Sequence, residues 1–314
     1  MRAAVHASDI DGIASAALLL MKYPNIEIDF LTLRDIKTKK EYDFVVDLPK
    51  LENGKINIDH HKTNYEKLLR DGQLSQKDLV DPNAPSAAQL LIKYLSLENN
   101  SRAIEIASMA NDSDQGKYDE KLYLLDKIIK CKSGDPETLY KIAELLIRRG
   151  RKFTKDEFFK HELNQLIAVI KKGRKFARKI AAYLRKQKVK VAVLDVISGF
   201  PRVTMSDLAW EFIANRGSII VVINRLKEPE KLCKNKSSGN FSHIHISIRV
   251  SKKVDFKANI FAEKIGGGGH EKAAGARIPI RKYYYILGKI IEELSLYQKP
   301  VSYFRIDENM LSKL

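Results

Sequence analysis

Short apolar runs separated by helix-length segments or turns recur along the first 150 residues. The runs "AAVHA", "IEIDFLTL", "DFVVDL" and "KINID" are each typical of a strand, and "IASAALLLMKY", between the first two, is typical of a helix. Such alternation favours an α/β layer fold with a largely parallel sheet. We therefore expect residues 1–150 to form one domain, a mainly parallel sheet flanked by helices.

In the next segment, residues 151–188, the spacing of the apolar residues is that of a helix rather than of a strand. Its apolar residues recur three or four positions apart, which predicts one long helix, and basic residues occupy much of the rest. The apolar positions are Leu163, Leu166, Ile170, Ala177, Ile180, Ala181 and Leu184. We expect a basic helical connector here.

Strand-like runs return in "KVKVAVLDV", "SIIVVI" and "HIHISIRV", with helical patterns in "VTMSDLAWEFIAN" and "YYILGKIIEELSL". They predict a second, smaller α/β domain over residues 189–314. The aromatic residues Trp210, Tyr283, Tyr284 and Tyr285 could stack on bases, but we expect most of them to be core. The last 16 residues, "KPVSYFRIDENMLSKL", would be a docking segment or a disordered tail.

Length and composition limit the number of domains and the class of protein. A chain of 314 residues suits two domains, and no apolar run approaches the ~20 residues of a membrane span. The start, "MRAAVHASDIDG", does not have the pattern of a secretory signal, and two cysteines are too few for a disulfide framework or a structural zinc site. We expect a cytoplasmic protein with no membrane partner.

The charge balance points to a polyanionic partner. The chain has 56 Lys and Arg against 39 Asp and Glu, a formal net charge of +17. Residues 148–190 hold much of the excess, with 16 basic residues and 3 acidic ones, a net of +13. Nucleic acid is the favoured partner for such a segment; the alternatives are a solvated helix face and a thermophilic composition.

Acidic residues and histidines follow the strand-like runs. They are His6, Asp9 and Asp11 in "HASDIDG", Asp47 in "VVDLP", Asp59, His60 and His61 in "IDHHKTN", and Asp114 in "ANDSDQG". Singly, an aspartate such as Asp11 is explained as a turn residue or a helix cap. Together these residues would lie at the carboxyl edge of one parallel sheet, where ligands gather. Imidazoles with hard carboxylates favour Mn²⁺ or Mg²⁺ over softer metals.

Two stretches of the second domain offer substrate contacts. In "FSHIHISIRVS" polar and apolar residues alternate, which predicts a strand with one face on the core. Its polar face could simply be solvated, but Arg249 is suited to grip a phosphate through two hydrogen bonds; His243 and His245 more often have no such role. In "FAEKIGGGGHEKAAGARI", glycines without Cβ let backbone N–H groups approach a phosphate or base. We interpret the glycine run as the substrate-side wall of a cleft rather than a linker.

These motifs, in this order, resemble those of the DHH family of phosphoesterases, and the stretch from "ISIRVSKKVDF" to "GGGGHEKAAG" resembles the DHHA1 domain. The likeness covers nearly all of the chain except its C-terminal end. It implies a C-terminal domain with a mixed sheet, a cleft between the domains, and an exonuclease of the RecJ-like or archaeal type.

The resemblance also implies roles for individual residues. Two Mn²⁺ ions are implied, with Mg²⁺ as the alternative. His6 and Asp9 would hold one ion, Asp11, His60 and Asp114 the other, and Asp47 would bridge them. The implied catalytic residues are His61, toward the substrate phosphate, and Asp59, which would support the cluster. The implied substrate-binding residues are Ser247, Arg249, Gly267, Gly268, Gly269 and His270.

Three functions fit these features. The preferred one is an exonuclease that removes mononucleotides from single-stranded DNA or RNA, because the basic connector suits a long substrate. The second is a phosphoesterase for small substrates: short oligoribonucleotides, 3′-phosphoadenosine 5′-phosphate or cyclic dinucleotides. The third, a non-catalytic nucleic-acid-binding protein, is disfavoured by the intact ligand set. The resemblance further implies a homodimer or small homo-oligomer, and a repair protein is a candidate partner.

Overall fold

The computed structural model describes residues 1–33, 35–117, 119–197, 200, 202–225, 243–298 and 300–313. Within this part of the chain, one compact unit ends at Leu166 and a second begins at Ile167. The division falls inside the long helix α7 (Glu157–Lys186), which follows the short 3-10 helix η1 (Gly150–Lys155). The connector predicted for residues 151–188 therefore corresponds to η1 and α7.

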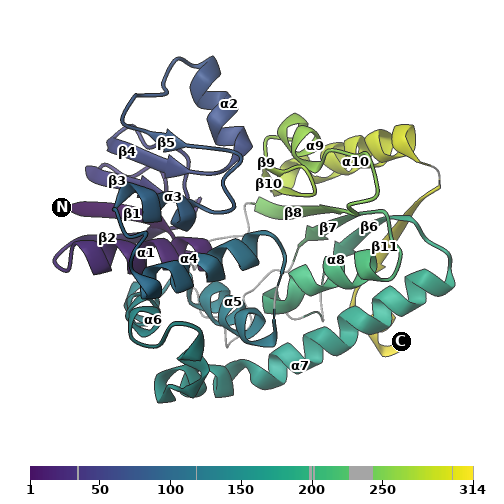
Figure 1. Ribbon diagram of the computed structural model, residues 1–314. Helices are drawn as coiled ribbons and strands as arrows, with labels where there is room; N and C mark the ends of the chain where they lie inside the picture. The colour runs from purple at the N-terminus through teal and green to yellow at the C-terminus, as the bar shows by residue number, and fades with distance from the viewer. Residues whose placement is uncertain are drawn as a thin grey trace. The chain divides into compact units, whose positions relative to one another are not determined.

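The first unit contains the predicted parallel sheet. Its five strands run in the order β2-β1-β3-β4-β5, and every neighbouring pair is parallel (Figure 1). Their bounds are β1 Arg2–His6, β2 Glu27–Leu31, β3 Tyr42–Val46, β4 Gly54–Asp59 and β5 Leu79–Val80. Ala3, Ala4 and Val5 of β1 are completely buried, as expected for a parallel strand covered on both faces.

The helices of the first unit gather around α1 (Ile10–Lys22), which is buried along most of its length. It packs against α3, α4 and α6, so its sequence is apolar nearly all round rather than on one stripe. The other helices of the unit are α2 Lys62–Arg70, α3 Ala87–Tyr94, α4 Ser101–Asp114, α5 Glu120–Lys132 and α6 Pro136–Arg149. The carboxylate of Asp9 caps α1 by accepting a hydrogen bond from the backbone N–H of Gly12 at 3.0 Å.

Helix α7 buries the stripe that the sequence predicts. Six of the seven predicted apolar positions are buried, and Leu163 is half-buried. The exposed basic residues of its second half include Lys171, Lys172, Lys175, Arg178 and Lys179. The helix is therefore a core element on one side and a cationic surface on the other.

The second unit has a six-stranded mixed sheet in the order β11-β6-β7-β8-β10-β9. Strands β11, β6 and β7 are parallel to one another, whereas β8, β10 and β9 pair antiparallel. The bounds are β6 Val191–Val196, β7 Ile219–Asn224, β8 His243–Val250, β9 Gly268–His270, β10 Ala273–Pro279 and β11 Val301–Ile306. Burial alternates strictly along β8, with Ile244, Ile246, Ile248 and Val250 buried, which confirms the predicted pattern.

Helices cover both faces of this sheet. One core includes the buried residues of β8 and side chains of α9 and α10, and the other includes Ala177, Ile180 and Leu184 of α7 with Leu208 and Phe212 of α8. The helix bounds are η2 Arg202–Thr204, α8 Met205–Ala214, α9 Ala258–Lys264, η3 Ile280–Lys282, α10 Tyr283–Tyr297 and α11 Glu308–Lys313.

Two expectations for the second domain are wrong. The C-terminal segment is neither a disordered tail nor a detached docking segment: β11 pairs with β6 over six residues, and Ile306 and Leu311 join a core. The aromatic residues are not mostly core either, because only Tyr283 is buried. Trp210, Tyr284 and Tyr285 are 42%, 82% and 62% exposed. Helical spacing predicts which residues share the apolar face of a helix. It does not predict how much of that face a neighbouring element buries.

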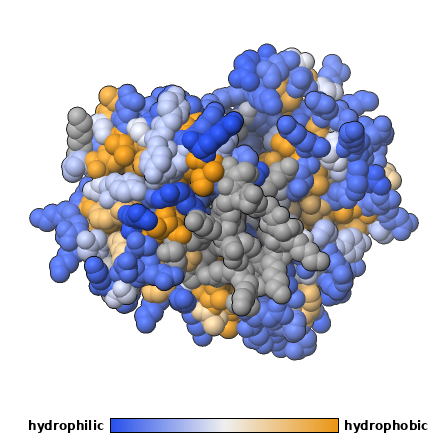
Figure 2. All heavy atoms as spheres, turned by 180° about the vertical axis from the view of Figure 1, so that it is seen from behind, coloured by the Kyte–Doolittle hydropathy of each residue, from blue (hydrophilic) through white to orange (hydrophobic). Residues whose placement is uncertain are grey.

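The surface is mostly hydrophilic on the face that Figure 2 shows, with apolar residues in small separate patches. Among the described residues, no helix is both long enough and apolar enough to cross a membrane.

Candidate active site

Three neighbouring strands of the first unit end in the residues of the candidate site. His6 is the last residue of β1, Asp47 follows β3, and Asp59 ends β4. These strands are adjacent and parallel, so their carboxyl ends meet at one edge, where α/β sheets place ligands. Convergence of the motifs at this edge was the main prediction from the sequence.

Asp47 lies between two groups of potential ligands. Its Oδ2 is 3.3 Å from Nδ1 of His6, and its Oδ1 is 3.9 Å from Nε2 of His60. Asp9 completes the first group, with Oδ2 at 2.7 Å from Nδ1 of His6. The backbone of Asp47 has φ 56°, a left-handed conformation that aspartate and asparagine tolerate better than most residues. One carboxylate oxygen of the buried Asp47 thus faces the cluster that contains His6, and the other faces the cluster that contains His60.

The second cluster is centred on the buried imidazole of His60. Its Nε2 is 3.1 Å from Oδ2 of Asp114 at the end of α4, and 3.6 Å from Oδ2 of Asp11 on α1. Asp11 also accepts hydrogen bonds from the backbone N–H groups of Ala87 and Ala88 at 2.7 and 2.8 Å. Asp11 therefore does have a capping role, but for α3 rather than for the helix that contains it.

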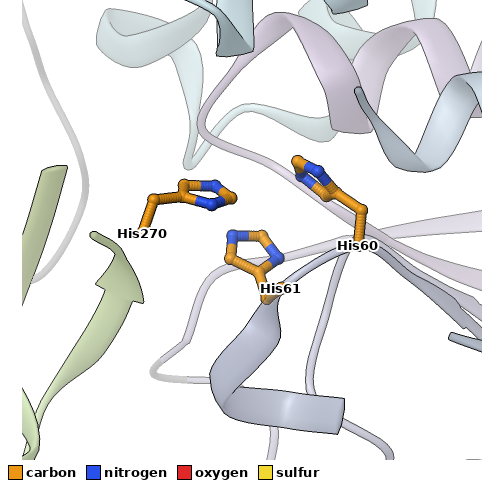
Figure 3. A group of neighbouring side chains, drawn as sticks. All are labelled: His60, His61 and His270. Atoms are coloured by element: carbon orange, nitrogen blue, oxygen red, sulfur yellow. The ribbon is translucent and has the colours of Figure 1, made fainter. Parts of the chain in front are cut away.

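The Asp59-His60-His61 triplet is organised by its own aspartate. Oδ1 of Asp59 accepts the backbone N–H of His60 at 2.8 Å and lies 2.7 Å from Nδ1 of His61. Figure 3 shows the His60 and His61 side chains, whose ring centroids are 4.7 Å apart with planes at 63°. Asp59 thus holds the ring of His61 and the backbone of His60.

Two buried asparagines support Asp59, and the sequence analysis missed them. Nδ2 of Asn64 donates to Oδ2 of Asp59 at 2.7 Å and to Oδ1 of Asn57 at 3.0 Å. Asn57 in turn donates to the carbonyl oxygens of Val45 and Leu48. Both asparagines lie within the stretch "INIDHHKTN", and an asparagine inside an apolar strand is the signal that could have identified Asn57.

The electrostatics of the site favour bound cations. Burial, and then the charge of Asp9, raise the pKa of Asp47 to about 7. Burial and the charge of Asp47 likewise raise the pKa of Asp11 well above its usual range. For His60, burial lowers the pKa, but the hydrogen bond to Asp114 and the charge of Asp11 outweigh it and raise the pKa to about 10. Buried carboxylates that repel one another are stabilised by protons or by metal ions.

The ligand atoms are spaced as a metal site requires. Two groups have all their ligand atoms within 4.8 Å of one another and share Asp47: His6, Asp9 and Asp47, and Asp11, Asp47 and His60. Asp59, His61 and Asp47 form a third such group, but Asp59 and His61 already bind each other. This donor set of carboxylate oxygens and imidazoles suits Mn²⁺ or Mg²⁺. The structure thus brings the six predicted ligands together, and their metal-binding role stays a prediction.

A metal titration tests the fit. Because neighbouring carboxylates hold a proton on His60 up to about pH 10, and ligation requires the neutral imidazole, metal binding must release that proton. Since Asp47 and Asp11 also have raised pKa values, we expect the apparent affinity for Mn²⁺ to rise by at least about tenfold per pH unit between about pH 6 and pH 8. Calorimetry in two buffers of different ionisation enthalpy measures the proton release. A pH-independent affinity with no proton release would contradict this assignment.

Gly12, in the first turn of α1, lies against the backbone of the site residue His6. A Cβ on this residue would overlap the carbonyl oxygen of His6. We expect Gly12→Ala to displace the end of β1, to lower the free energy of unfolding by about 1–3 kcal/mol, and to weaken Mn²⁺ binding. The matched control is Gly288→Ala in α10, where no atom lies within 4 Å of the added Cβ and helix propensity predicts a gain of about 0.5–1 kcal/mol. Thermal unfolding with and without Mn²⁺ measures both effects, and similar behaviour of the two variants would contradict this role of Gly12.

The predicted substrate-binding residues lie in the second unit. Ser247 and Arg249 are on the polar face of β8, and both are half-buried. Nη1 of Arg249 donates to the carbonyl oxygens of Ile248 and Ala274, at 2.8 and 3.3 Å. Its guanidinium carbon is 5.6 Å from the ring centroid of Trp210. Arg249 is therefore held in a fixed position on the sheet face.

The glycine run has a structural explanation of its own. Gly266 follows the C-cap residue of α9, Ile265, and has φ 81°; Gly269 has φ 135°, and both values lie in the region that favours glycine. A Cβ on Gly267 would overlap the carbonyl oxygen of Gly275 on β10. His270 ends β9, and its side chain is labelled in Figure 3. The linker interpretation is excluded, since the run forms a turn and a strand, and substrate contacts of Gly267, Gly268, Gly269 and His270 stay predictions.

Comparison with known proteins agrees with this fold. Residues 187–295 match the DHHA1 domain family. The pGpG-specific phosphodiesterase PggH of Vibrio cholerae is similar in structure, with a TM-score of 0.55, 16% sequence identity, and coverage of 95% of this chain and 99% of PggH. RecJ of Thermus thermophilus in complex with Mn²⁺ is similar with a TM-score of 0.54 and 14% identity over 97% of this chain, which spans about half (54%) of RecJ.

No curated protein sequence matches the chain. Three observations agree with the resemblance seen in the sequence: the DHHA1 match in the second unit, the fold shared with PggH and RecJ, and the ordered motifs, among them Asp59, His60 and His61. Residues 187–295 are thus assigned to the DHHA1 domain family, and the fold of the chain as a whole is similar to that of PggH and RecJ.

Proposed function

We propose that the protein is a metal-dependent phosphodiester hydrolase, and that its substrate is single-stranded DNA or RNA from which it releases mononucleotides. The observation that carries the proposal is the position of Asp47, whose two carboxylate oxygens face one cluster with His6 and another with His60. Two adjacent sites with a shared carboxylate suit a pair of divalent cations.

Mn²⁺, or Mg²⁺ in its place, would be held by His6 and Asp9 on one side and by Asp11, His60 and Asp114 on the other, with Asp47 shared. When bound, such ions activate water and stabilise the attacking and leaving oxygens of an in-line displacement. The protein contributes a rigid donor set, since Asp47 and Asp11 are buried and fixed by strand and helix ends.

His61 is suited to act on the substrate phosphate. Burial lowers its pKa, but the charge of Asp59 outweighs this and raises the pKa to about 9 in the metal-free protein. Nδ1 contacts Asp59 at 2.7 Å, and Nε2–H is the group that would donate to a phosphate oxygen. A fixed, protonated imidazole could bind the phosphate and protonate the leaving oxygen.

The cationic surface of α7 favours a long substrate. Lys171, Arg174, Lys175, Arg178 and Lys179 line a shallow pocket of about 330 Å³, and Arg178 pairs with Glu211 at 3.2 Å. A dinucleotide needs few phosphate contacts, whereas a strand of many phosphates gains from an extended basic surface.

Charge reversal on this surface tests the substrate length. We expect the variant Lys171→Glu, Lys172→Glu, Lys175→Glu and Lys179→Glu to lower kcat/KM on a single-stranded 20-mer by at least about tenfold at low salt, with little change on a dinucleotide. All four side chains are exposed, so the fold should be retained, as circular dichroism can verify. An equal loss of kcat/KM on both substrates would contradict a role of α7 in binding a long substrate.

A second candidate is hydrolysis of short substrates. This chain covers 99% of PggH, described as a pGpG-specific phosphodiesterase, but only 51–54% of the RecJ chains. A dinucleotide such as pGpG is therefore the alternative substrate.

One experiment distinguishes these candidates. Single-stranded DNA and RNA 20-mers, labelled at each end in turn, and pGpG are incubated with the protein and Mn²⁺, with the double variant Asp59→Ala and His60→Ala as the inactive control. Release of mononucleotides from a 20-mer supports the exonuclease and shows its polarity. Hydrolysis of pGpG alone supports the second candidate, and hydrolysis of neither contradicts both.

Further proposals concern the oligomeric state, the location and the partners of the protein. We propose a homodimer or small homo-oligomer in the cytoplasm, with a repair protein as a partner. Light scattering of the purified chain measures the oligomeric state, and a monomer at micromolar concentration would contradict that part.

A further inference from the structure

We propose that Trp210 is the platform on which a nucleobase of the substrate stacks. This inference rests on the proposed function, because it assigns a part of the nucleotide to a part of the second unit. The indole is 42% exposed, and the guanidinium of Arg249 lies over its ring at 5.6 Å. A large aromatic ring that is exposed beside a cation is a suitable site for a flat, electron-rich ligand with an attached anion.

The helix holds the ring in place. Leu208, Ala209 and Phe212 of α8 are buried in the core beneath the sheet face. Their burial fixes the rotation of α8 and leaves the side chain of Trp210 at the edge of that core. Because this indole is not itself a core residue, core packing does not account for a tryptophan at this position.

The cation beside the ring, Arg249, is also held in place. Its Nη1 donates to the carbonyl oxygens of Ile248 and Ala274, so the guanidinium is fixed by two strands. A cation over an indole adds roughly 0.5–1 kcal/mol at an exposed site. A pre-oriented ring loses little conformational entropy when a base stacks on it, which favours affinity.

Small residues lie beside the polar side chains of β8. In the register of β8 with β10, Arg249 lies opposite Ala273, and Ser247 lies opposite Gly275. Small residues therefore flank the polar side chains on this face, and all four residues are half-buried rather than covered. A cation and a hydroxyl beside one aromatic ring suit a nucleotide better than an apolar protein surface.

The only tryptophan in the sequence gives a direct readout. We expect GMP and guanosine to quench its fluorescence, and ribose 5-phosphate, which lacks a base, to leave it unchanged. In kinetics on the hydrolysed substrate, Trp210→Ala should raise KM about 5- to 100-fold with little change in kcat, and Trp210→Phe should keep most of the affinity. Tyr284→Ala, which removes another exposed aromatic side chain, is the matched control and should leave KM within about twofold.

Three results would overturn the proposal: no quenching at GMP concentrations that inhibit hydrolysis, equal quenching by ribose 5-phosphate, or an unchanged KM for Trp210→Ala. Quenching needs no turnover, so its failure is separate from failure of the proposed function. An active enzyme whose tryptophan does not respond contradicts only the stacking site. A responsive tryptophan without hydrolysis contradicts only the catalytic proposal.

Discussion

Asp47→Asn is expected to lower kcat/KM for phosphodiester hydrolysis by about 10³-fold or more, the largest effect on activity that we predict. The amide keeps the size of the side chain, and asparagine tolerates the left-handed backbone at φ 56°, so the loop should be preserved. Only the charge shared by the two clusters is lost. A steady-state assay with saturating Mn²⁺ measures the effect.

The same substitution should not destabilise the metal-free protein. Burial and Asp9 raise the pKa of Asp47 from 3.8 to about 7, so ionisation of this carboxylate opposes folding increasingly as the pH rises from about 4 through about 7. Above pH 7 we therefore expect the metal-free variant to melt at the same temperature as the wild type or higher. Asp43→Asn, at the exposed part of the same strand, is the control and should keep full activity. Loss of the folded state in Asp47→Asn, or activity near that of the wild type, would contradict the role of Asp47.

Asp195→Ala is expected to cause the largest loss of stability. The carboxylate of Asp195 is fully buried on β6 and binds Nε of Arg225 at 2.7 Å, together with the hydroxyls of Tyr283 and Tyr303 at 2.7 and 2.8 Å. Removal of the carboxylate leaves the half-buried guanidinium of Arg225 without this counter-ion, and the hydroxyls of Tyr283 and Tyr303 with only each other at 3.4 Å in place of their shared acceptor. Breaking such a pair costs about 3 kcal/mol or more.

Denaturation followed by tryptophan fluorescence measures this loss in the second unit, because the single tryptophan lies in α8. The control is Glu293→Gln, which removes one charge from an exposed pair with Lys264 at 2.7 Å and should change stability by less than about 1 kcal/mol. Equal effects of the two variants would show that the Asp195 cluster is not a stabilising element.

Much of the fold could be predicted because periodicity reflects burial directly. The apolar runs of β1, β3 and β4 and the strict alternation along β8 each identified a strand. The polar residues that follow β1, β3 and β4 identified the edge where the site lies. A local sequence pattern is sufficient to predict the position of the site when the motifs follow neighbouring parallel strands, because strand pairing then brings the motifs together.

Long-range partners could not be predicted in the same way. Asp11 caps a helix that begins 76 residues later, and β11 pairs with β6 across more than 100 residues. Exposure of Trp210 depends on how far β8 and its neighbours cover α8, which helical spacing does not state. Asp195 could have been suspected, since an aspartate inside the apolar run "VAVLDV" needs buried partners, but the identity of those partners depends on the tertiary fold.

The most direct test of the central claim is the metal dependence of hydrolysis. The protein is treated with EDTA, dialysed, and assayed on the single-stranded 20-mer and on pGpG before and after addition of Mn²⁺. Our account predicts no hydrolysis after EDTA, full recovery with Mn²⁺ for the wild type, and no recovery for Asp47→Asn. Full activity of the EDTA-treated protein, or recovery of Asp47→Asn to the level of the wild type, would contradict it.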